Sequence, residues 1–208
     1  MCSLTTKIKI RSSFVSIFLI SMSQQSFAIV DCQVPKVFRH YDEVTCLGNN
    51  GLAVVKLKNK FGLINQEGQI IAPIEYDSIL PSSNGLSSVQ KNGKWGFIDK
   101  QNHLVIPFKY DFVKSFSEDL AVVMKAGKFG FIDKTGKEVI PLKYENAEGF
   151  TNGLSQVSLN NKVGMINKKE KVIIPFKYDI IRNFINGKAE VTLDNKTFFI
   201  DKTGKRVK

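Results

Sequence analysis

The sequence predicts an all-β fold built from tandem repeats, and three observations carry this prediction. A short phrase, Lys94-Trp95-Gly96-Phe97-Ile98-Asp99, recurs along the chain. Its glycines return with a constant step of 34 residues, at Gly62, Gly96, Gly130 and Gly164. Within each copy, apolar and polar residues alternate with a period of two, as they do in half-buried strands. A fixed period of this length indicates an array of identical supersecondary units.

The third copy shows the elements expected in each unit. Residues 120–125 are rich in β-branched side chains and predict a first strand, and Ala126-Gly127 predicts a turn. Residues 128–133 predict a second strand, in which Gly130 occupies a position that strands ordinarily disfavour. Such a glycine indicates a β-bulge or the close approach of a neighbouring backbone or aromatic ring.

The second half of the unit predicts another hairpin and a short third strand. Residues 133–136 form a turn signal that ends in glycine, and residues 138–140 read as a strand. Pro141 has no N–H for a ladder hydrogen bond, so we expect it to end this strand. Each unit is therefore predicted to be a three-stranded β-meander.

A single meander cannot bury its apolar face alone, so neighbouring units must stack to form a core. We expect an open, β-solenoid-like array, with a small closed propeller as the alternative. Five units are expected in the repeat domain at 50–208, the last of them incomplete. A closed ring would require this incomplete unit to meet the N-terminal segment.

The N-terminus has the pattern of a secretory signal peptide. Basic residues at Lys7, Lys9 and Arg11 precede a short apolar run at 14–22, and Ser26-Phe27-Ala28 offers a cleavage site. We therefore predict a signal peptide at 1–28, with an uncleaved anchor as the alternative. No later apolar stretch reaches spanning length, so no transmembrane segment is expected after cleavage. The mature chain is expected to be exported, to the periplasm or outside the cell.

Residues 29–49 are predicted to form an N-terminal cap that is closed by a disulfide. Cys32 and Cys46 are the two cysteines that remain after signal cleavage, and an oxidising compartment would join them. Two isolated cysteines without a nearby cluster of histidines do not supply the full ligand set of a metal site, so no metal or other cofactor is expected.

The repeated phrase resembles a known family. Residues 92–99 and 105–111 are similar to the unit of the bacterial WG-repeat family, and the likeness extends over about residues 41–208. Only Trp95 keeps the tryptophan of that unit, and Asn102 and Glu170 replace its turn glycine. The resemblance implies a β-rich repeat array that acts as a binding or scaffolding module, with no catalytic residues to transfer.

Positive charge is the main candidate for a binding determinant. The chain without its signal peptide has 27 basic and 19 acidic residues, a net charge of +8, which attracts anionic polymers and surfaces. Lysines that recur just before the aromatic position would align in a stacked array: Lys60, Lys94, Lys128, Lys162 and Lys196. Two further lysine registers recur in the same way: Lys100, Lys134, Lys168 and Lys202, and Lys109, Lys143 and Lys177. Such stripes could bind an anionic polymer, or they could serve solubility and protection of strand edges.

The aromatic residues allow two interpretations. Trp95, Phe97, Phe129 and Phe131 could form a platform on which sugars or bases stack. Their alternation with polar residues at strand spacing favours the core instead, with Trp95 the least certain member, because its N–H needs a partner.

Catalytic chemistry is not indicated. His40 and His103 are the only histidines and are expected at the surface. The recurring Asp99, Asp133 and Asp201 could bind calcium, but Asn replaces them in other copies, which favours a turn role.

We therefore expect an exported, non-catalytic repeat protein that binds a protein or an anionic polysaccharide in the cell envelope or outside the cell. Nucleic acid is not expected as a partner. An envelope hydrolase and a purely structural spacer are the alternatives.

Overall fold

The computed structural model describes residues 32–37, 39–48 and 50–208, and the predicted signal peptide lies outside these ranges. Within them, the backbone forms strands and turns but no helix, which confirms the all-β prediction. It follows that this part of the chain contains no helix that could cross a bilayer.

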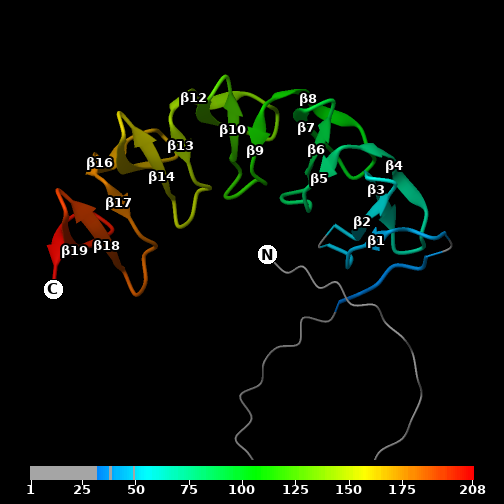
Figure 1. Ribbon diagram of the computed structural model, residues 1–208, viewed down its shortest axis with the longest axis horizontal. Helices are drawn as coiled ribbons and strands as arrows, with labels where there is room; N and C mark the ends of the chain where they lie inside the picture. Colours follow the sequence, from blue (N-terminus) through cyan, green and yellow to red (C-terminus); the bar gives the residue numbers. More distant parts are fainter. Residues whose placement is uncertain (1–31, 38, 49) are drawn as a thin grey trace, which may run out of the picture. The chain divides into compact units, whose positions relative to one another are not determined.

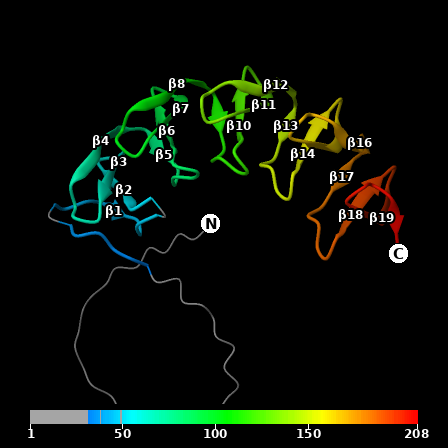
Figure 2. The same cartoon turned by 180° about the vertical axis from the view of Figure 1, so that it is seen from behind.

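Twenty strands in the described ranges form five antiparallel sheets of four strands each. Sheet 1 contains β1 (Glu43–Val44), β2 (Leu52–Leu57), β3 (Lys60–Asn65) and β4 (Ile70–Tyr76). Sheet 2 contains β5 (Ser78–Ile79), β6 (Ser87–Lys91), β7 (Lys94–Ile98) and β8 (Leu104–Tyr110). Sheet 3 contains β9 (Phe112–Val113), β10 (Ala121–Lys125), β11 (Lys128–Ile132) and β12 (Glu138–Tyr144). Sheet 4 contains β13 (Asn146–Ala147), β14 (Leu154–Leu159), β15 (Lys162–Asn167) and β16 (Val172–Tyr178). Sheet 5 contains β17 (Ile180–Ile181), β18 (Lys188–Leu193), β19 (Lys196–Asp201) and β20 (Arg206–Val207). Figures 1 and 2 show the sheets following one another in chain order.

The prediction of three strands per unit was wrong by one. Each sheet begins with an additional strand of two residues, which in sheets 2 to 5 follows directly on the last strand of the preceding sheet. Glu145 alone separates β12 of sheet 3 from β13 of sheet 4. Two residues are too few to show an alternating pattern, which is why this strand escaped prediction.

The third long strand does not end at its proline, contrary to expectation. β12 continues through Pro141 to Tyr144, and its pairing with β11 is irregular, with Phe131 opposite Ile140 and Phe129 opposite Tyr144. The strand therefore bulges between these pairs. Pro141 lies in this bulge, where its lack of an N–H breaks no ladder hydrogen bond.

The bulge explains the recurring glycine. A Cβ atom on Gly130 would lie 2.7 Å from the Ile140 carbonyl oxygen and 2.9 Å from the Leu142 nitrogen. A Cβ atom at the three equivalent glycines would lie equally close to the corresponding carbonyl oxygen, at 2.8 Å for Gly62, 2.6 Å for Gly96 and 2.8 Å for Gly164. The expected close approach of a neighbouring backbone is thus confirmed at all four positions.

The core lies between successive sheets. Phe131 of β11 is fully buried. The centre of its ring lies 4.9 Å from the ring centre of Phe150, which precedes β14 in the next sheet. Phe97 and Phe116 make the same contact one unit earlier, at 5.1 Å. The prediction that each unit completes its core with its neighbour is confirmed.

Two turns that depart from the glycine pattern bond to the preceding sheet. The Tyr76 hydroxyl donates to Asn102 Oδ1 at 2.8 Å, and the Tyr144 hydroxyl donates to Glu170 Oε1 at 3.1 Å. Asn102 and Glu170 have φ of 68° and 61°, a conformation that favours glycine. An inter-sheet hydrogen bond therefore accompanies a backbone conformation that costs these residues energy.

Ala126 offers a stabilising substitution. Ala126 and Gly127 are the central residues of the β10–β11 turn, with φ of 51° and 73°, and asparagine tolerates this conformation better than alanine does. Ala126→Asn should raise the free energy of unfolding by about 0.5 kcal/mol in urea titrations. Ala126→Val is the opposite control and should lower it.

The predicted disulfide is present in the structure, where Cys32 and Cys46 are joined with their Cα atoms 5.3 Å apart. It closes the N-terminal segment next to β1. Replacing both cysteines with serine should lower stability by about 3 kcal/mol, because the unfolded chain gains the entropy of a loop of this size. Urea unfolding would measure the loss. A reducing agent should lower the stability of the parent protein by a similar amount and leave that of the serine variant unchanged.

Candidate binding surface

The first lysine register occupies the start of the second long strand in every sheet, as the repeat predicts. One member begins one strand in each of the five sheets: Lys60 in β3, Lys94 in β7, Lys128 in β11, Lys162 in β15 and Lys196 in β19. They are thus distributed over five sheets and are not gathered at one site.

Three of these lysines are ion-paired. Lys60 Nζ lies 2.6 Å from Asp77 Oδ1, and Lys162 Nζ lies 2.6 Å from Asp179 Oδ1. Lys94 pairs with Asp111 in the same way. Each aspartate directly follows the last strand of the same sheet. The ion pair therefore joins the start of the second long strand to the connection that leads to the next sheet.

The same aspartates reach into the next sheet. The Ala126 N–H donates to Asp111 Oδ2 at 2.8 Å, and the hydrogen bonds from Lys94 and Ala126 lower the pKa of Asp111. Gly93 N–H donates equivalently to Asp77, and Asp194 N–H to Asp179. Their carboxylates therefore bridge adjacent sheets, and the three lysines have a structural role.

These bridges predict a loss of stability in acid. The folded-state pKa values of Asp77, Asp111 and Asp179 are lowered, chiefly by the lysine hydrogen bonds. Their contribution is present above the unfolded pKa, near 3.9, and is lost as the pH falls through the lower folded values. The melting temperature should therefore fall below about pH 4, and less steeply when all three are changed to asparagine.

The control for this pH series is Glu67→Gln, which removes an exposed carboxylate that makes no ion pair within the described ranges. Its melting temperature should follow that of the parent protein. An equally steep acid transition in the triple asparagine variant would contradict the assigned role.

Lys128 and Lys196 differ from the other three lysines. Neither forms an ion pair within residues 32–37, 39–48 and 50–208. In sheet 3 the aspartate position is taken by Glu145, which accepts the Asn161 N–H at 2.8 Å. The register therefore contains both paired and unpaired cations.

The remaining lysine registers also make contacts inside the protein. Lys109, Lys143 and Lys177 place their ammonium groups 5.2, 5.4 and 5.2 Å from the ring centres of the adjacent tyrosines. Lys134 pairs with Asp119 at 2.8 Å, and Lys168 pairs with Glu118 at 3.2 Å. Much of the predicted stripe is thus committed to structural contacts.

The four aromatic residues considered for a stacking platform do not form an exposed surface together. Phe97 and Phe131 are fully buried, so the core interpretation is confirmed for them. Trp95 and Phe129 are half-buried and pack against the cores from β7 and β11, which are inner strands of their sheets. The rings of Phe97 and Phe131 are therefore not accessible for stacking on a ligand.

The aspartates at 99, 133 and 201 form turns, as predicted. Asp133 Oδ1 accepts the Thr135 and Lys137 N–H groups at 2.9 and 3.1 Å, and the hydrogen bonds with Thr135 lower its pKa. His103 Nδ1 lies 2.9 Å from Asp99 Oδ2 in an exposed turn. Within the described part of the chain, no three His, Cys, Asp or Glu residues are grouped as a metal site would require.

The net positive charge is concentrated near the C-terminal end, which an average over the chain conceals. Residues 161–208 contain 12 basic and 5 acidic residues, a net charge of +7. Residues 29–160 contain 15 basic and 14 acidic residues, a net charge of +1. Almost the whole excess therefore lies in sheet 5 and the last two strands of sheet 4.

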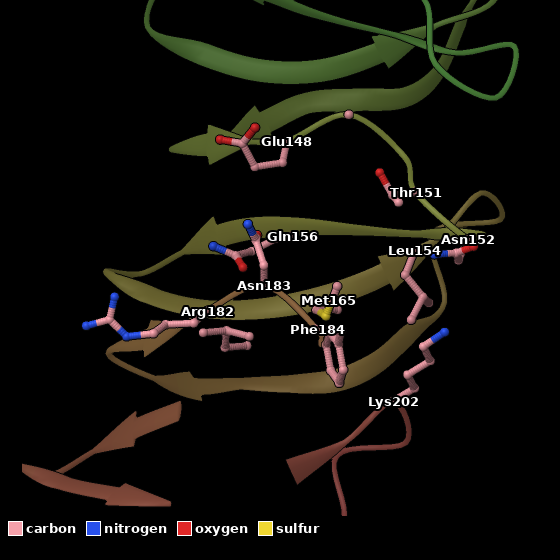
Figure 3. A pocket seen from close by; sticks show the side chains of 12 residues that line it. Glu148, Thr151, Asn152, Leu154, Gln156, Met165, Arg182, Asn183, Phe184 and Lys202 are labelled. Atoms are coloured by element: carbon pink, nitrogen blue, oxygen red, sulfur yellow. The ribbon is translucent and has the colours of Figure 1, made fainter. Parts of the chain in front are cut away.

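An open pocket of about 440 Å³ lies between sheets 4 and 5 (Figure 3). Its wall combines polar and apolar side chains. The polar ones include Gln156, Arg182 and Lys202, and the apolar ones include Leu154, Met165 and Phe184. The repeat pattern did not predict this pocket, although Met165 interrupts the register that contains Phe97 and Phe131.

Fold and repeat together define a tandem β-repeat protein. The sequence profile described as "WG containing repeat" matches residues 61–95, 95–129, 129–162 and 164–196, which is more than half of the chain. The chain belongs to the WG containing repeat family, as the resemblance implied. No match was found among curated proteins.

Solved structures with a similar fold are distant in sequence. A eukaryotic initiation factor matches with a TM-score of 0.56 and 12% identity, over 84% of this chain and 56% of that one. Hsv2 from Kluyveromyces lactis matches with a TM-score of 0.46 and 11% identity, over 76% of this chain and 59% of that one. The chain thus spans somewhat more than half of each. The match to the initiation factor shows a similar fold, which agrees with either an open array or a closed ring.

Proposed function

We propose that this protein is exported and binds an anionic polysaccharide of the cell envelope or the extracellular medium, without catalysis. The observation that carries the proposal is the concentration of a net charge of +7 in residues 161–208. A cluster of one sign raises the local concentration of oppositely charged polymers and speeds their association.

Export is supported by the signal-like N-terminus and by the disulfide. The bridge between Cys32 and Cys46 suits an oxidising compartment. Mass spectrometry of the protein recovered from the exported fraction tests this directly, and a mature N-terminus at Ile29 is the expected result.

The binding experiment uses the purified protein with polygalacturonate, dextran sulfate and neutral dextran across a salt series. We expect binding to both anionic polymers, which weakens steeply with salt, and none to neutral dextran. Capture of one defined envelope protein without salt dependence would instead favour a protein scaffold. Binding to none of these partners would favour a structural spacer.

A pair of matched charge-reversal variants tests where the polymer binds. Changing Lys169, Lys171 and Lys205 to glutamate should weaken polymer binding about tenfold. The control changes three exposed lysines of the N-terminal part, Lys100, Lys125 and Lys137, and alters net charge by the same amount. Its affinity should fall less than about twofold. Equal losses in the two variants would show that net charge alone matters, and would contradict the assignment to residues 161–208.

A further inference from the structure

The pocket between sheets 4 and 5 lies where the two preceding junctions have an aromatic pair, whereas the first junction has Leu63 and Ser82 at these positions. Phe131 and Phe150 fill this position between sheets 3 and 4, and both are buried. One unit later, Met165 replaces the first phenylalanine, and Phe184, in the register of the second, is only half-buried. Loss of one ring from the junction leaves space for a ligand.

A second replacement makes the pocket polar. Val122 in sheet 3 is buried, whereas Gln156 at the same register of sheet 4 is half-buried and lines the pocket. Asn152 and Asn183 add further amide groups to the wall. Figure 3 shows Gln156, Asn183, Met165 and Phe184 among the side chains that line the pocket.

The ion pair at the preceding junction has no counterpart among the described residues of this one. Between sheets 3 and 4, Glu118 accepts the Gly153 N–H at 3.1 Å and pairs with Lys168 at 3.2 Å. The residues that follow by one repeat are Asn152 and Lys202, so the carboxylate is replaced by a neutral amide. Within the described ranges, Lys202 forms no ion pair with a carboxylate.

The other charges on the pocket wall are already balanced. Arg182 Nε lies 2.7 Å from Glu190 Oε1, and Glu148 pairs with Lys114. Among the described residues that line this wall, Lys202 is therefore the cation that lacks a counterion, in a region of net positive charge.

These features define the chemistry of a ligand. An unpaired ammonium group favours an anion, amide groups can bond hydroxyls, and Phe184 with Met165 and Leu154 offers an apolar surface for the face of a ring. The volume of about 440 Å³ lies within the range of small-molecule sites. We propose that the pocket binds one carboxylated sugar unit of the anionic polysaccharide, with its carboxylate on Lys202. This inference rests on the proposed function and specifies its site.

Two variants test the pocket without disturbing the general charge of the surface. Met165→Phe restores the ring that sheets 2 and 3 carry, and Lys202→Gln removes the unpaired cation. Each should weaken polygalacturonate binding about tenfold, because the first fills the space for the sugar ring and the second removes the partner of its carboxylate. Lys134→Gln removes an equal charge at the same register two sheets earlier and should change the affinity less than about twofold.

Dextran sulfate separates the pocket from the charged surface. It is anionic but has no carboxylated sugars, so Met165→Phe should leave its binding unchanged. If the parent protein binds both polymers and Met165→Phe leaves polygalacturonate binding intact, the pocket assignment is overturned while the proposed function stands. If the parent protein binds neither polymer, the proposed function itself fails.

A further variant guards against misfolding of Met165→Phe, which a thermal melt would reveal. Asn152→Glu returns the carboxylate that Glu118 supplies at the preceding junction and gives Lys202 an internal partner. It should also weaken polygalacturonate binding, because the sugar carboxylate must then compete with the introduced carboxylate for Lys202. Unchanged affinity in a folded Asn152→Glu protein would contradict the role of Lys202.

Discussion

Replacing Gly130 with valine should lower the free energy of unfolding by about 4 kcal/mol, because a side chain at this position meets backbone atoms that cannot move aside. The Cβ atom would lie 2.7 Å from the Ile140 carbonyl oxygen. That carbonyl belongs to the bulge through which β12 reaches Tyr144. Ile140 itself lies in the core shared with sheet 4, and Leu142 packs against the core shared with sheet 2. Relief of the clash would therefore disturb pairing in sheet 3 and its contact with sheet 4.

Gly127→Val is the matched control for Gly130→Val. Gly127 has φ of 73° and nothing within 4 Å of its virtual Cβ, so valine meets conformational strain of about 1–2 kcal/mol but no clash. Urea unfolding of the two variants, followed by circular dichroism, would separate the two costs. Similar losses for the two would mean that the bulge yields easily, and that the recurring glycine has another cause.

The glycine also illustrates how much of the fold could be predicted from sequence. A constant step of 34 residues and a glycine in a strand were sufficient to predict a repeated close approach of backbone. The turn role of Asp133 was predictable for a similar reason, since its hydrogen bonds reach residues only two and four positions away. Local rules suffice where the interacting groups are close in the chain.

Features that depend on contacts between sheets could not be predicted in this way. The pair of Lys94 with Asp111 joins residues 17 positions apart, and nothing local relates them. These ion pairs change the interpretation of the first lysine register, because three of its five members stabilise the fold. The two-residue strands were missed because each is too short to show an alternating pattern and is set by its pairing with the following strand of its sheet.

The candidate site was missed for a different reason. A repeat directs attention to positions that agree, whereas the pocket arises at Met165, Gln156 and Asn152, which differ from the residues one repeat earlier. Taken alone, none of these three differences indicates a binding site. Together they remove a ring, add an amide and delete a carboxylate at one junction, and only the structure shows that these changes lie around the same space.

The junction that keeps its aromatic pair provides the second prediction of large effect. Phe131→Ala should destabilise the protein by about 4 kcal/mol, because it removes a fully buried ring and leaves a cavity between sheets 3 and 4. The loss should appear as a lower urea midpoint. The neighbouring Phe150 would lose its partner at 4.9 Å, so the two sheets would be less tightly coupled.

Phe199→Ala is the control for Phe131→Ala, because Phe199 has the same register in sheet 5 but is 45% exposed. It should cost less than about 1 kcal/mol, since little apolar surface returns to water. The contrast tests whether stability depends on burial between sheets or on the aromatic residue itself. If both substitutions cost the same, the stacking of successive sheets would not be the main source of stability, and an isolated unit would have to be stable on its own.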